Sequence, residues 1–152
     1  MMSLFGGIDA AASGLTAERL RMDVISNNIA NANTTRTAEG GAFKRKYVVF
    51  EPRVESEPNF ARILAGEIFP PKDPVGKGVR ATRIGTDDTP GTMVYDPGHP
   101  DANRDGYVEK PNINIVAEMV DMITASRGYE ANVTVINAAK TMAQSALDIG
   151  KG

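Results

Sequence analysis

The 152-residue sequence contains no cysteine, no tryptophan and only one histidine. Without cysteine, the chain can form neither a disulfide bond nor a thiolate metal site. His99 stands between Gly98 and Pro100, so a zinc site would need carboxylates to complete it, and a Ser-His-Asp triad would depend on a histidine in a turn. We therefore predict no catalytic residue, no metal site and no cofactor, and we expect that the protein is not an enzyme.

Long apolar runs are absent as well. No segment approaches the roughly 20 consecutive apolar residues of a membrane-spanning helix, so we expect no direct membrane insertion. The first residues lack a basic segment followed by an unbroken apolar one, because Asp9 and Glu18 fall where a signal peptide would be apolar. We therefore expect no cleaved signal peptide.

The chain has no strong charge of either sign. Its net charge of −2 provides no general attraction for nucleic acid, which we do not expect as a partner. The segment Phe43–Tyr47, FKRKY, combines basic and aromatic residues and could contact phosphates or stack on bases. A strand edge protected by lysine and arginine is the interpretation we favour.

Proline is missing from both ends of the chain. All nine prolines lie between Pro52 and Pro111, and a helix interior tolerates proline poorly. We predict an α+β fold with an N-terminal assembly helix in residues 1–35, a small β-rich insert in residues 36–112 and a C-terminal assembly helix in residues 113–152. Glycine and proline concentrate near residues 63–78, where we expect a mobile loop.

Apolar residues in both terminal segments recur at alternating steps of four and three, which places them on one side of a helix. A C-terminal helix of some 35 residues would be about 52 Å long, more than a compact domain of this size needs. We expect the two helices to form a coiled-coil-like pair that is well ordered only in an assembly. The predicted assembly interface consists of Leu4, Ile8, Leu15, Met22, Ile25, Ile29, Met119, Met122, Tyr129, Val133, Ile136 and Leu147.

One short segment suggests a different function. The sequence DANRDG, which begins at Asp101, matches the opening of a calcium-binding EF-hand loop. The loop would end at Asn112, where a bidentate glutamate is required, and Pro111 prevents a normal outgoing helix. A calcium-binding module that uses the Asp101–Asn112 loop is therefore the alternative hypothesis, and a polar turn is the interpretation we favour.

The helical pattern at the N-terminal end stops at an asparagine-rich segment, SNNIANANTT, which spans Ser26–Thr35. Asparagine tolerates the backbone conformations that end helices, and its side chain bonds to nearby backbone groups. Together with the C-terminal segment, this motif resembles the flagellar rod and hook protein family, and is closest to its proximal rod branch. The residues that carry the motif are Ala30, Asn31, Asn33, Thr34, Ser126, Arg127, Tyr129, Glu130 and Asn132.

The resemblance implies a structural subunit of the proximal rod of the bacterial flagellar basal body. It implies helical assembly through the terminal helices into the periplasmic drive shaft, and export through the flagellar type III apparatus. The implied partners are further copies of this chain, other rod proteins and components of the base of the basal body. Gly128 stands where the family often has alanine or serine, and glycine weakens a helix interior by roughly 1 kcal/mol.

Overall fold

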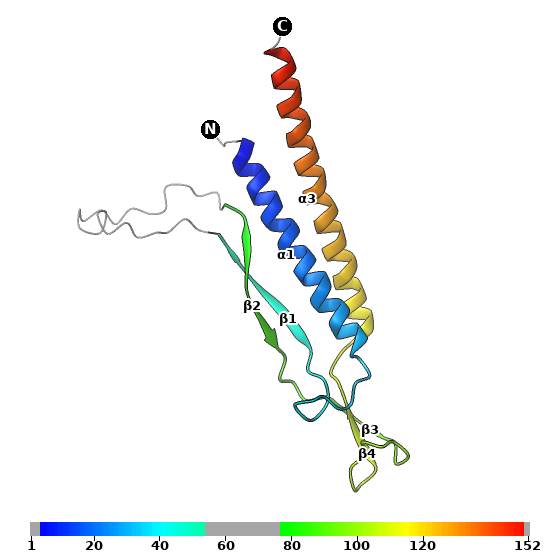
Figure 1. Cartoon of the computed structure of the whole chain (residues 1–152). Helices are drawn as coiled ribbons and strands as arrows, with labels where there is room; N and C mark the ends of the chain where they lie inside the picture. The colour runs from blue at the N-terminus through cyan, green and yellow to red at the C-terminus, as the bar shows by residue number, and fades with distance from the viewer. Residues whose placement is uncertain (1–3, 54–76, 151–152) are drawn as a thin grey trace, which may run out of the picture.

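The computed structural model describes residues 4–53 and 77–150. Two long helices lie side by side, one β-hairpin runs along the first helix, and a second, shorter hairpin lies at one end of the pair (Figure 1). This arrangement confirms the predicted α+β fold. The loop expected near residues 63–78 falls outside the described residues, except for Lys77 and Gly78. The elements in chain order are α1 (Leu4–Ala30), β1 (Lys46–Pro52), β2 (Val79–Thr86), β3 (Thr92–Tyr95), β4 (Tyr107–Lys110) and α3 (Ile115–Ile149).

Asparagine side chains bond to the backbone at the end of α1 and at the start of α3. The Asn114 side-chain oxygen accepts hydrogen bonds from the backbone N–H groups of Val116 and Ala117, at 3.0 and 3.2 Å. These N–H groups have no partner within the helix, so the contact stabilises the first turn. At the end of α1, the Asn31 side-chain amide donates to the Asn27 carbonyl at 2.9 Å.

Small residues form much of the contact between α1 and α3. Ala11, Ala17, Ala125 and Ala139 are buried. The two helices run antiparallel, and Gly14 of α1 faces Asn132 of α3 so closely that an added Cβ would lie 2.8 Å from the asparagine nitrogen. Small side chains allow two helix axes to approach closely, so these residues determine which side of each helix lies in the contact.

The first hairpin covers a second side of α1. Strands β1 and β2 are antiparallel, with Lys46 opposite Thr86 and a register shift between Val49 and Phe50. The guanidinium of Arg21 on α1 lies 4.8 Å from the centroid of the Phe50 ring. Because α1 lies between α3 and this hairpin, it is covered on two sides, whereas α3 contacts only α1 over most of its length (Figure 1).

The first residues of β2 are attached to α1 through Ser13. The Ser13 hydroxyl accepts a hydrogen bond from the Val79 N–H at 3.0 Å and donates to the Ala10 carbonyl at 2.7 Å. Gly78 has a φ of +104° and lies against Ser13, so both its backbone conformation and its surroundings require glycine. The buried Ser13 was not part of the predicted seam because it faces the hairpin and not α3.

The pairing of α1 with α3 occurs within one chain. Each helix finds in the other the partner that its seam requires, and packing supplies most of the stability of a helix in a protein. Whether the terminal helices are ordered outside an assembly stays a prediction.

The close approach at Gly14 can be tested by substitution. In Gly14→Leu the new side chain meets Asn132, and we expect the free energy of unfolding to fall by about 1–3 kcal/mol because the contact is overpacked. Gly6→Leu is the matched control, since no atom lies within 4 Å of the position of its Cβ. Urea denaturation followed by circular dichroism measures both; equal stability of the two variants would contradict the close contact.

Candidate assembly site

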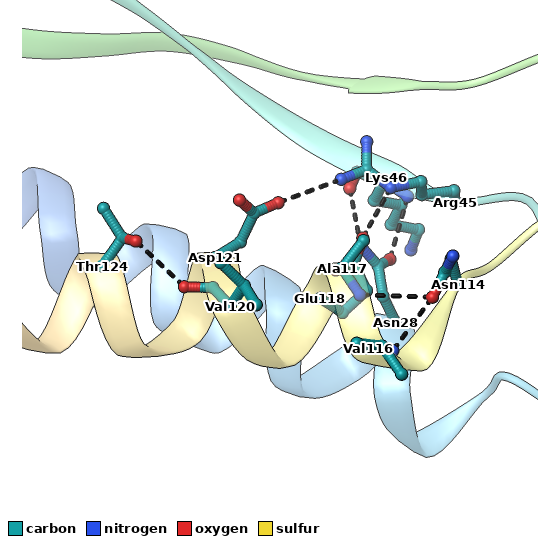
Figure 2. Close-up of polar contacts among 10 residues, drawn as sticks. All are labelled: Asn28, Arg45, Lys46, Asn114, Val116, Ala117, Glu118, Val120, Asp121 and Thr124. Atoms are coloured by element: carbon teal, nitrogen blue, oxygen red, sulfur yellow. Dashed lines mark hydrogen bonds and ion pairs between the residues drawn. The ribbon is translucent and has the colours of Figure 1, made fainter.

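A buried polar cluster joins α1, α3 and the first hairpin (Figure 2). Glu118 of α3 and Asn28 of α1 are 1% and 0% exposed. The Asn28 amide donates to the Lys46 carbonyl at 2.8 Å and to the Glu118 carboxylate at 3.0 Å, while its oxygen accepts from the Lys46 N–H at 2.9 Å. Arg45 donates to the other Glu118 oxygen at 2.6 Å. We call these four residues, Asn28, Arg45, Lys46 and Glu118, the polar junction.

The polar junction contains a carboxylate that is removed from water and therefore requires hydrogen-bond and ion-pair partners. An unpaired buried charge is strongly unfavourable, whereas a paired and hydrogen-bonded one is tolerated. Both oxygens of Glu118 have partners, and the Asn28 side chain bonds at both its oxygen and its nitrogen. Arg45 also lies 3.7 Å from Asp121, one turn further along α3. The start of α3, the end of α1 and the start of β1 are therefore held in one mutual position.

The chain leaves α1 through the asparagine motif. Asn31 bonds to the Asn27 carbonyl, as described above, and its oxygen accepts from the Thr34 hydroxyl at 3.1 Å. Asn33 is exposed, and its side chain forms no hydrogen bond to any residue of 4–53 or 77–150. Only the first of the two asparagines therefore has the backbone-bonding role that the sequence suggested.

The segment considered as an alternative calcium loop forms hydrogen bonds within the protein. The Asp101 carboxylate accepts a hydrogen bond from Thr35 at 2.8 Å and lies 3.7 Å from Arg36, so it links the segment after α1 to the β3–β4 connection. The Asn103 oxygen accepts from the N–H groups of Asp105 and Tyr107, each at 2.9 Å. Across the described part of the chain, no cluster of three or more acidic or histidine side chains is arranged to hold a metal ion. The segment is the polar turn that we favoured.

Large apolar side chains are exposed mainly on α3. Of the fourteen found among residues 4–53 and 77–150, nine belong to α3 and none belongs to the described side chains of α1. Five lie within the first nine residues of α3, and we call them the α3 ridge: Ile115, Val116, Met119, Val120 and Ile123. Val116 lies on the side of α3 away from β1, whereas Asp121 points toward Arg45 (Figure 2).

A second exposed apolar group lies at the other end of α3. Met142, Leu147 and Ile149 are exposed, and the last turns of α3 extend past the start of α1 (Figure 1). We call these three residues the α3 tip. Both groups lie where α1 does not cover the helix.

Most residues of the predicted seam are buried or half-buried within the single chain. Ile25 is buried; Ile8, Leu15, Met22, Ile29, Met122, Tyr129, Val133 and Ile136 are half-buried; and Met119 and Leu147 are exposed. The side chain of Leu4 lies outside the described ones. On α3, the contact stripe includes Glu118, Ala125, Asn132 and Ala139, so that Met119 and Val133 of the predicted seam lie one position after it. Whether the seam residues take part in assembly stays a prediction.

The motif residues of α3 divide between the contact with α1 and the surface. Ser126, Tyr129 and Asn132 are half-buried, whereas Arg127 and Glu130 are exposed. Gly128 lies against Glu18 of α1, and a Cβ there would be 3.4 Å from the glutamate side chain. Glycine at this position therefore leaves space for Glu18 in the helix contact.

Comparison with known proteins identifies the family. Residues 8–36 match the model of the flagella basal body rod protein, and residues 104–149 match the C-terminal model of the flagellar basal body rod FlgEFG proteins. The chain is 50% identical to the flagellar basal-body rod protein FlgC of Borreliella burgdorferi, 44% to that of Bacillus subtilis and 34% to that of Salmonella typhimurium. Each alignment covers 99% of this chain and 100% of the relative.

The chain belongs to the FlgC family of flagellar basal-body rod proteins. The resemblance predicted from the two terminal motifs is confirmed. As a member of the FlgC family, the protein is a structural subunit of the rod and is located in the flagellar basal body. Neither helix of the described residues is long and apolar enough to cross a membrane.

Arg45→Met tests the polar junction. Methionine replaces the aliphatic part of the arginine side chain but removes the cation beside the buried Glu118. The free energy of unfolding should therefore fall by about 3 kcal/mol. Arg53→Met is the control, because its ion pair with Asp9 is exposed and 3.8 Å long, and exposed pairs contribute about 1 kcal/mol or less. Thermal and urea unfolding measure the difference, and equal effects of the two substitutions would contradict the importance of the junction.

Proposed function

We propose that the protein is a subunit of the proximal rod that joins its neighbours through the uncovered side of α3. The observation that carries the proposal is the concentration of exposed apolar side chains on α3, while none of the described large apolar side chains of α1 is exposed. An exposed apolar cluster marks a surface for interaction with other proteins, and burial of one such side chain contributes roughly 1.5–3 kcal/mol. Five neighbouring residues in the α3 ridge thus provide a substantial driving force for association.

The rod function requires contacts that extend into a shaft. The α3 ridge and the α3 tip lie at opposite ends of one helix, so two different surfaces are available on each copy. Contacts between two different surfaces repeat from copy to copy. If each copy is also shifted along the axis of rotation, the copies do not close into a ring but form a helical tube. We infer that copies of this chain associate with one another, with other rod proteins and with components of the base to form the periplasmic drive shaft.

The three parts of the chain have separate roles in this proposal. Residues 1–35 and 113–152 supply the helix pair that enters the shaft, and residues 36–112 form the insert that rests on it. The half-buried and buried residues of the predicted seam hold the pair together, and the α3 ridge, which includes Met119, contacts neighbours. We assign no catalytic activity to the protein, in keeping with a family of structural subunits. We also infer that the flagellar type III apparatus exports the chain.

Val120→Asp tests the assembly surface. An aspartate in an interface that excludes water should reduce the amount of the chain in isolated basal bodies at least tenfold and abolish swimming. The fold should not change, because Val120 is exposed in the single chain. Thr16→Asp is the control, since Thr16 is exposed on α1 outside the ridge. Normal incorporation of Val120→Asp would show that this side of α3 is not an assembly surface.

Substitutions in the asparagine motif distinguish a role in export from a role in assembly. In Asn31→Ala the Asn27 carbonyl and the Thr34 hydroxyl lose a partner, so we expect normal secretion and a lower fraction of chain in the rod. Asn33→Ala removes no hydrogen bond within residues 4–53 and 77–150 and should have a smaller effect, unless a neighbour or the export apparatus contacts that side chain. Immunoblots of the secreted and rod fractions measure both steps. Accumulation of Asn31→Ala inside the cell would contradict its structural role.

A further inference from the structure

The second hairpin has few attachments to the rest of the protein. Strands β3 and β4 pair with each other, and their Cα atoms lie more than 8 Å from those of the described helices and of the strands of the first hairpin (Figure 1). A hairpin of two strands is only marginally stable by itself. The segments between the elements must therefore set its direction relative to the helix pair.

Asp101, in the connection between β3 and β4, provides an attachment to the end of α1. Its carboxylate accepts a hydrogen bond from the Thr35 hydroxyl at 2.8 Å, and both residues are half-buried. Arg36 lies 3.7 Å from the same carboxylate, but its side chain is 79% exposed, so the charge-assisted hydrogen bond is the stronger of the two contacts. We call Thr35, Arg36 and Asp101 the clasp. It joins the end of the asparagine motif to the start of the DANRDG segment.

Both sides of the clasp belong to internally bonded segments. On the α1 side, the Asn31 oxygen accepts from the Thr34 hydroxyl, and the Thr34 carbonyl accepts from the Phe43 N–H at 3.0 Å. On the hairpin side, the Asp101 N–H donates to the His99 Nδ1 at 3.1 Å. The clasp therefore connects two ordered turns, and a displacement of one turn is transmitted to the other.

We propose that the clasp is a conformational device that fixes the direction of the second hairpin relative to the helix pair. With the clasp closed, the hairpin is attached at the end of α1 as well as through its own chain connections. With the clasp open, it is free to turn about those connections. The inference goes beyond the proposed function, because it does not depend on which surface contacts a neighbour.

Two other contacts near the hairpin are less able to set its direction. Val108 of β4 is buried, but burial of an apolar side chain is not directional, whereas a hydrogen bond is. Lys44 and Asp88 form an ion pair before β3, and their side chains are 60% and 77% exposed. Exposed ion pairs contribute little.

Spin labels can measure the direction of the hairpin, because the natural chain contains no cysteine that would compete for them. Ser26→Cys on α1 and Met93→Cys on β3 place two labels at exposed positions. We expect double electron–electron resonance to give a single narrow distribution of distances. Thr35→Val removes the hydroxyl donor and should widen the distribution about twofold, whereas Thr35→Ser keeps the donor and should leave it narrow. The unfolding temperature of the helices should stay the same, because the clasp lies outside their contact.

Asp101→Ala and Asp105→Ala form a second matched pair, taken from the same segment. Asp101→Ala should widen the distribution as Thr35→Val does. Asp105→Ala should not, because the Asp105 side chain is exposed and bonds to no residue of 4–53 or 77–150. A narrow distribution in both Thr35→Val and Asp101→Ala would overturn the inference, and so would a wide distribution in the labelled chain without these substitutions. Equal widening by Asp105→Ala would overturn it as well, since the folding of the connection, and not the clasp, would then set the direction.

Discussion

The buried carboxylate of Glu118 constrains the rest of the structure. It needs partners that come from outside its own helix, and these are Arg45, immediately before β1, and Asn28, near the end of α1. Asn28 in turn bonds to both backbone groups of Lys46. Few arrangements of three elements satisfy so many polar groups at once, and an unsatisfied arrangement is costly at low dielectric. We infer that the polar junction sets the register of the helices and the position of the hairpin.

Once the register is set, the two helices are no longer equivalent. Glycines leave space in the contact, where Gly14 faces Asn132 and Gly128 faces Glu18, and α1 is covered by α3 on one side and by the hairpin on another. The first residues of α3 have only α1 as a neighbouring helix, so the ridge stays exposed. An exposed apolar ridge on an otherwise covered helix pair is the kind of surface through which a subunit contacts its neighbours.

The sequence predicted the two helices and the family, but not how the helices contact each other. Proline distribution and periodicity are local signals, and they located both helices correctly. The contact between the helices depends on Ala125, Asn132 and Ala139, which a search for large apolar residues passes over. Val116, Val120 and Ile123 were missed for a related reason, since periodicity identifies a single stripe and α3 has apolar residues on two sides.

The polar junction could not be found from sequence alone. Asn28, Arg45 and Glu118 are far apart along the chain, and nothing in their neighbourhoods marks them as buried. The asparagine motif was visible, but its residues differ in role: Asn31 bonds to the end of α1, whereas Asn33 is exposed. Such distinctions depend on contacts between distant segments, which a pattern in one segment cannot specify.

Electron cryomicroscopy of isolated basal bodies, at a resolution that shows side chains, tests the assembly surface most directly. The density should show α1 and α3 paired as in the single chain, the polar junction intact, and Val116 and Val120 covered by a neighbouring subunit. Density in which these two valines face solvent, or in which α1 and α3 have separated to pair with other chains, would contradict assembly through the uncovered side of α3.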